Sequence, residues 1–91
     1  MFVRRLSIRR IDASGVGHPC PIRWIDSFAM RNFTNDQVFD DTLPAADGLL
    51  EAGVRVPLDR LRADLEDWFR RKGYLKPEER LEVVEIGGTG P

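Results

Sequence analysis

The chain has 91 residues, of which 42% are hydrophobic and 32% are charged, and this balance is typical of one globular domain with a modest core. Its formal net charge is −1, yet arginines dominate residues 1–25 and acids dominate residues 26–54, so opposite charges can pair across the fold. One cysteine excludes an internal disulfide and predicts a reducing, cytoplasmic location, and no apolar run reaches the roughly 18 residues that span a bilayer.

The first predicted element is a strand over residues 2–11, because apolar and polar residues alternate there. Its apolar face carries Phe2, Leu6 and Ile8. Arg5 and Arg9 fall on the opposite face together with Ser7, which predicts a half-buried strand with one basic, solvated side. Because arginine pairs with carboxylates as well as with phosphates, Arg5 and Arg9 are candidate contacts for a binding partner.

His18 and Cys20 stand two positions apart in the segment GHPCPIRW, and each is followed by a proline. A cysteine nucleophile needs a base and an oxyanion hole, but the prolines remove two backbone N–H donors where that hole would form. His18 and Cys20 alone provide too few ligands for zinc, which takes three or four from the protein, unless Asp12, Asp26 or a second subunit supplies the others. We predict a proline-stiffened loop with Cys20 turned inward, and no catalytic residue, metal or cofactor.

Residues 22–33 fit two periodicities. Trp24 and Phe28 would lie on one face of a strand, whereas Ile25 and Ala29 would lie on one face of a helix. Because Trp, Phe and Ile favour strands and prolines precede the segment, we predict a strand.

The middle of the chain contains an acidic segment, NDQVFDD, with Asp36, Asp40 and Asp41. It lacks the spacing and the central glycine of a calcium-binding loop, so we predict a solvated loop that offers negative charge to a basic partner. A short helix is predicted next, between Pro44 and Gly53, although Gly48 weakens it.

The strongest local pattern predicts a long amphipathic helix at about residues 57–72. Its apolar stripe consists of Leu58, Leu61, Leu65, Trp68 and Phe69. Pro57 suits the first turn, and Gly73 followed by Tyr74 suits a Schellman motif at the end. Two ion pairs with i,i+4 spacing are predicted on the solvated face, Glu66–Arg70 and Asp67–Arg71.

Short strands are predicted on both sides of this helix, at residues 53–56 and 81–86. In the second, Leu81 and Val83 face one way while Val84 and Ile86 face the other, which predicts a strand covered on both sides. The order of elements predicts an α+β fold, in which a mostly antiparallel sheet carries the long helix. We expect a single domain over residues 1–86 and a flexible tail over residues 87–91.

These features predict a small non-enzymatic protein-interaction module: a regulator, inhibitor or accessory subunit that binds another protein and no membrane. A homodimer through a sheet edge is one form of this prediction, because a small domain must protect its edge strands or use them. The candidate protein-binding residues are Arg5, Arg9, Asp36, Asp40 and Asp41. The alternative is a nucleic-acid-binding protein that uses the first strand together with a second basic cluster, Arg70, Arg71 and Lys72. The sequence pI of about 5.8 disfavours that alternative.

Overall fold

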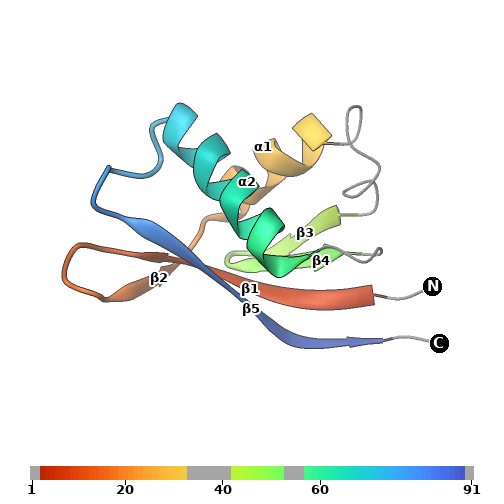
Figure 1. The fold of residues 1–91 in the computed structure, drawn as a ribbon. Coiled ribbons are helices and arrows are strands. Elements are labelled where there is room, and N and C mark those ends of the chain that lie inside the picture. Colours follow the sequence, from red (N-terminus) through yellow and green to blue (C-terminus); the bar gives the residue numbers. More distant parts are fainter. Residues whose placement is uncertain (1–2, 33–41, 53–56, 90–91) are drawn as a thin grey trace.

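The computed structural model describes residues 3–32, 42–52 and 57–89 (Figure 1). In chain order the elements are β1 (Val3–Ile11), β2 (Gly17–Pro19), α1 (Ile22–Asn32), β3 (Thr42–Ala46), β4 (Leu49–Ala52), α2 (Leu58–Arg71) and β5 (Arg80–Thr89). Both helices lie on one side of an antiparallel sheet, which confirms the predicted α+β class, although two helices cover the sheet rather than one. The predicted strand at 53–56 and the acidic residues Asp36, Asp40 and Asp41 lie outside the described residues.

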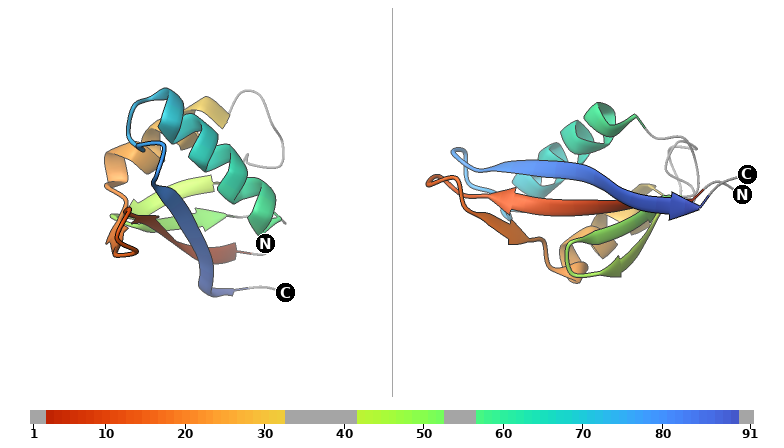
Figure 2. Two further views of the ribbon diagram at one scale, coloured as in Figure 1. Left: turned by 60° about the vertical axis from the view of Figure 1, so that its left-hand side comes forward. Right: turned by 90° about the horizontal axis from the view of Figure 1, so that it is seen from below.

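β1 is the central strand of the sheet. Along one side it pairs with β5 over its whole length, from Val3 opposite Thr89 to Ile11 opposite Arg80. Along the other side it pairs first with β4 and then, beyond Ser7, with β2, while β3 adds to the far side of β4. β5 therefore forms one edge of the sheet, and the view from below in Figure 2 shows it alongside β1.

The core lies between the sheet and the helices, and alternate residues of β1 contribute to it. Leu6 and Ile8 are fully buried while Arg5 and Arg9 are exposed, as the alternation predicts. The helices contribute Ile25 and Phe28 from α1, and Leu61, Leu65 and Phe69 from α2. Because burial of one such side chain contributes roughly 1.5–3 kcal/mol, this shared core holds both helices on one face of the sheet.

α2 confirms the predicted helix, including its end. Gly73 has a φ of 78°, a left-handed conformation that glycine adopts without steric cost. The N–H of Tyr74 donates to the carbonyl of Phe69 at 2.8 Å, and the N–H of Gly73 donates to the carbonyl of Arg70 at 3.1 Å. These are the two hydrogen bonds of a Schellman motif. Both predicted ion pairs form, Asp67–Arg71 at 2.8 Å and Glu66–Arg70 at 3.6 Å.

Trp68 lies at the margin of the core, where it is half-buried rather than fully buried. Its indole N–H donates to Ser27 Oγ on α1 at 3.1 Å, and that hydroxyl donates to the carbonyl of Trp24 at 2.8 Å. Lys72 Nζ lies 5.0 Å from the centroid of the Trp68 ring. Trp68 thus joins α2 to α1 through a polar contact as well as an apolar one.

Residues 22–32 form α1, so the strand predicted there is wrong. Ile25, Phe28 and Ala29 are buried, at the i, i+3, i+4 spacing of one helical face. At the start of the helix, Asp47 Oδ1 accepts the N–H of Ile22 at 2.7 Å. A buried stripe and a capping carboxylate from elsewhere in the chain outweigh the weak strand preference of the aromatic and branched residues.

Residues 42–52 form a hairpin of β3 and β4, so the short helix predicted for this segment is wrong. The turn contains Asp47 and Gly48, and Gly48 has a φ of 74°. The carbonyl of Gly48 accepts the N–H of Ile8 at 2.8 Å, and its N–H donates to the carbonyl of Cys20 at 2.6 Å. The turn is therefore fixed against β1 and against the residue that follows β2.

β5 departs from the prediction in two respects. Residues 87–89, which the sequence assigned to a flexible tail, instead continue the strand and pair with the beginning of β1. In addition, the strand is covered on one side only, because Leu81 is buried whereas Val84 and Ile86 are 45% and 56% exposed. Seen from below in Figure 2, no described helix lies in front of β1 and β5.

Candidate functional site

His18 belongs to a hydrogen-bond cluster centred on Asp12, at the turn between β1 and β2. Asp12 Oδ2 lies 2.8 Å from His18 Nε2, while Asp12 Oδ1 accepts the Ser14 hydroxyl at 2.6 Å and the N–H of Val16 at 3.0 Å. These bonds, that from Ser14 above all, hold the pKa of the Asp12 carboxyl well below its usual range. The cluster orders the turn, since Ser14 and Val16 lie only two and four residues after Asp12 in the chain.

Cys20 does not join this cluster, because its side chain is fully buried in the core. Burial raises the pKa of its thiol to about 12, so the thiolate needed for nucleophilic attack or for metal binding is scarce at neutral pH. His18 is 42% exposed, so the two residues face different surroundings. Within residues 3–32, 42–52 and 57–89, no group of three His, Cys, Asp or Glu side chains could hold a metal ion.

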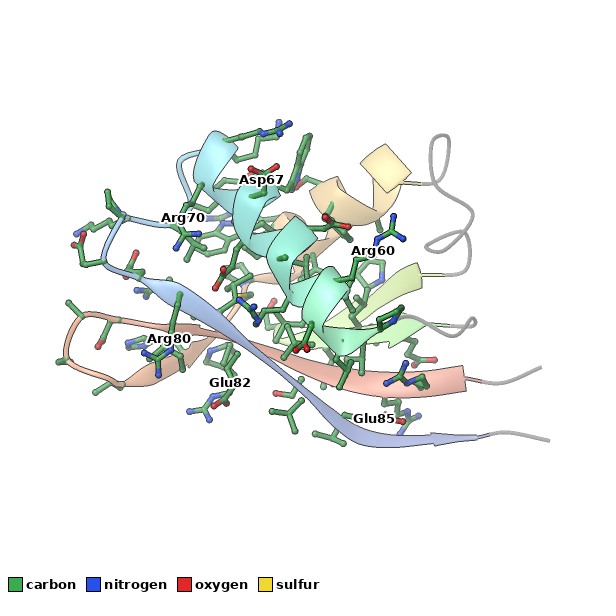
Figure 3. The ribbon with its side chains drawn as sticks, in the orientation of Figure 1. Arg60, Asp67, Arg70, Arg80, Glu82 and Glu85 are labelled. Carbon is green, nitrogen blue, oxygen red and sulfur yellow. The ribbon has the colours of Figure 1, made fainter. Side chains whose placement is uncertain are left out.

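The side of the sheet opposite the helices, hereafter the outer face, gathers side chains from three strands. It carries Arg5, Ser7 and Arg9 of β1, Leu49 and Glu51 of β4, and Glu82, Val84 and Ile86 of β5. The register places Arg9 opposite Glu82, and Arg5 opposite Glu51. Figure 3 shows Glu82 on the side of the sheet away from α2.

Charges on the outer face are mixed and only partly paired. Arg9 and Glu82 form an exposed ion pair at 3.5 Å, of a kind that contributes about 0–1 kcal/mol. Two other arginines of β1 are paired away from the outer face, Arg4 with Glu85 and Arg10 with the buried carboxylate of Glu79. Among the described residues, neither Arg5 nor Glu51 has an ion-pair partner, although they are cross-strand neighbours.

A hollow of about 190 Å³ lies on the outer face and is lined by residues of β1, β3, β4 and β5. Its lining is mainly aliphatic, with one guanidinium and one carboxylate: Arg5, Ala45, Leu49, Leu50, Glu51 and Ile86. Ile86 stands at its rim and is the most exposed large hydrophobic side chain of the described residues. An apolar hollow that contains two charges without ion-pair partners among the described residues, next to an exposed aliphatic side chain, is a candidate recognition site.

The second predicted basic cluster lies on the other side of the sheet from Arg5 and Arg9, since α2 packs on the opposite face (Figure 3). Each of its members also has an intramolecular contact. Arg70 donates to the carbonyl of Glu79 at 2.8 Å, Arg71 pairs with Asp67 and Lys72 stacks on Trp68. The structure therefore does not bring the two basic clusters onto one surface.

Sequence reasoning found Arg5 and Arg9 but missed the apolar part of the outer face. The sequence predicted that Val84 and Ile86 form a second covered side of the strand. Apolar residues on both sides of a strand do not reveal whether a second layer of structure covers the sheet. The hollow depends on the β3–β4 hairpin, which was predicted as a helix. The sequence does contain a signal for this hairpin, the dipeptide Asp47-Gly48, which is strongly favoured in hairpin turns.

None of the helices in the described part of the chain is long and apolar enough to cross a bilayer. Comparisons with protein-family models, with curated proteins and with solved structures found no significant match to this chain.

Proposed function

We propose that this chain is a non-enzymatic protein-interaction module that binds its partner through the outer face. The observation that carries the proposal is the exposure of Val84 and Ile86 beside an aliphatic hollow of about 190 Å³. Each square ångström of apolar surface removed from water contributes about 25 cal/mol, so a partner that covers this patch gains free energy. A polar rim around a small apolar centre is the usual anatomy of a protein interface. The single cysteine supports a reducing compartment, the cytoplasm, as the proposed location of the module.

A binding role is favoured over catalysis because the two reactive side chains are engaged elsewhere. Cys20 is buried, with the pKa of its thiol raised to about 12. His18 is held by Asp12 at the turn between β1 and β2. Neither borders the hollow, whose polar groups, Arg5 and Glu51, suit ion pairing and hydrogen bonding.

Protein is favoured over nucleic acid because the outer face carries both signs of charge. Glu51 and Glu82 stand directly opposite Arg5 and Arg9, so a phosphate backbone laid on this face would meet carboxylates as often as guanidinium groups. Phosphate recognition relies on several cations acting together.

The proposal is tested by affinity capture with the Ile86→Lys variant, which places a charge at the centre of the apolar patch. We expect a specific protein, either this chain or another, to be retained by the wild type from a lysate of the host and lost with Ile86→Lys. The matched control is Val16→Lys, since Val16 is 52% exposed at the turn between β1 and β2. Equal retention by the wild type and Ile86→Lys, measured by quantitative mass spectrometry, would show that the outer face is not the binding surface.

A further inference from the structure

We infer that the partner that fits the outer face is a second copy of this chain; the inference rests on the proposed function. The face carries a projection and a hollow side by side. Ile86 is 56% exposed at the rim of a hollow of about 190 Å³. A two-fold axis beside Ile86 lets each copy insert this side chain into the hollow of the other, as a self-complementary interface requires.

The hollow has room for such a side chain. Apolar cavities of about 150 Å³ in proteins accept a ring as large as benzene. A hollow of about 190 Å³ therefore accommodates the smaller aliphatic side chain of isoleucine. Its lining by Ala45 and Leu49 gives that side chain aliphatic neighbours.

The charges of the hollow favour a partner that carries both signs at the contact, as a second copy does. Arg5 and Glu51 both line the hollow, and within the described residues each is without an ion-pair partner. A partner of one charge sign would leave one of these two groups buried and unpaired, which is costly. The same two-fold axis places Arg5 of each copy beside Glu51 of the other, so both charges are paired in a symmetric contact.

The surface required is also available. A stable interface buries roughly 800 Å² on each partner. The molecule measures 40 × 26 × 21 Å, and the sheet formed by β1, β4 and β5 extends along it (Figure 2). The outer face can therefore supply a standard interface, with the exposed Arg9–Glu82 pair at its margin.

The first experiment measures the mass of the purified full chain by sedimentation equilibrium over a concentration series. We expect a monomer–dimer equilibrium, in which Ile86→Lys raises the dissociation constant by at least about 30-fold, the effect of losing an interface hot spot. Val16→Lys is the control and should leave the constant unchanged. Circular dichroism verifies that both variants are folded. A monomeric wild type at roughly 100 µM, or a dimer that Ile86→Lys leaves intact, would overturn the inference.

The second experiment tests the charge arrangement by mixing two variants. Arg5→Glu leaves two acids at the contact and Glu51→Arg leaves two cations, so each variant should dimerise at least about 10-fold more weakly than the wild type. Mixed in equal amounts, they should form a heterodimer at concentrations where each alone is monomeric, because opposite charges then meet across the axis. If the mixture dimerises no more tightly than either variant alone, the predicted contact between Arg5 and Glu51 is contradicted.

The two proposals can fail separately. If the wild type is monomeric but captures a different protein, and Ile86→Lys abolishes that capture, the second copy is not the partner. The proposal of a protein-interaction module is then retained. A chain that neither dimerises nor captures any protein through Ile86 overturns both.

Discussion

Gly48 shows how one residue without a side chain fixes the position of the hairpin that borders the hollow. Its φ is 74°, and a Cβ atom added there would lie 3.0 Å from Pro19 Cβ and 3.4 Å from the carbonyl oxygen of Ile8. The backbone of Gly48 also bonds to Ile8 and Cys20. Glycine is therefore required both by the backbone conformation and by the close approach of two other segments.

Gly48→Ala should lower the free energy of unfolding by more than the roughly 1–2 kcal/mol that a left-handed alanine costs. The matched control is Gly73→Ala, since Gly73 has a φ of 78° but open space around it, so that only the backbone cost applies. Urea unfolding of both variants measures the difference. Equal losses would mean that the contact with Pro19 relaxes at no cost.

The Asp12 carboxylate predicts a pH dependence of stability. Its hydrogen bonds with Ser14, His18 and Val16 hold its pKa in the folded protein below the usual value of about 3.9. A group with a lowered pKa stabilises the folded state above its unfolded pKa, and this contribution is lost as the pH falls toward the folded pKa. The stability difference between the wild type and Asp12→Asn should therefore shrink as the pH falls below about 4.

Urea unfolding at a series of pH values measures this difference. Asp26→Asn is the control, because the Asp26 carboxylate makes no hydrogen bond to the described residues. A difference that does not change between about pH 3 and pH 7 would show that the Asp12 cluster adds no stability.

At the scale of elements, α2 could be predicted from the sequence because everything that defines it is local. Its apolar stripe, its two ion pairs and its Schellman motif all lie within 58–74. α1 could not be predicted, because its first hydrogen bond depends on a residue far away in the chain. Asp47, which accepts the N–H of Ile22, is 25 residues away in the hairpin turn. The exposure of one side of β5 could not be predicted for a similar reason, since it depends on which side of the sheet the helices occupy.

Within α2, Phe69 should matter more for stability than Trp68. Phe69 is fully buried and contacts the rings of Trp24 and Tyr74, with centroids 5.6 and 5.8 Å away. Phe69→Ala should therefore destabilise the fold by about 3–5 kcal/mol, and Trp68→Ala by less, because Trp68 is half-buried. Urea denaturation of the two variants compares them. A larger loss for Trp68→Ala would place the centre of the core between the helices rather than above the sheet.

At the scale of the whole molecule, opposite charges are mixed on the outer face and the two basic clusters lie apart. The outer face mixes Arg5 and Arg9 with Glu51 and Glu82, and the cations at the end of α2 lie on the other side of the sheet. We therefore expect random-sequence DNA and RNA to show no binding at micromolar protein and about 150 mM salt.

Fluorescence anisotropy over about 50–200 mM salt tests this expectation. Affinity that falls steeply with salt, and that disappears in the Arg5→Glu/Arg9→Glu double variant, would place nucleic acid ahead of protein as the partner. Arg71→Glu is the control, since Arg71 lies on α2 and is paired with Asp67.

The pairing of β1 with β5 joins the first described strand to the last, with Val3 opposite Thr89. Every other described element lies in the long segment that this pairing closes, and closing a longer segment costs more chain entropy. During synthesis β1 leaves the ribosome well before β5, so one whole side of β1 stays unpaired while the β3–β4 hairpin and the helices form. Until the chain's own β5 arrives, that side can accept the same strand from a neighbouring chain, which makes refolding at high concentration the condition that favours strand exchange.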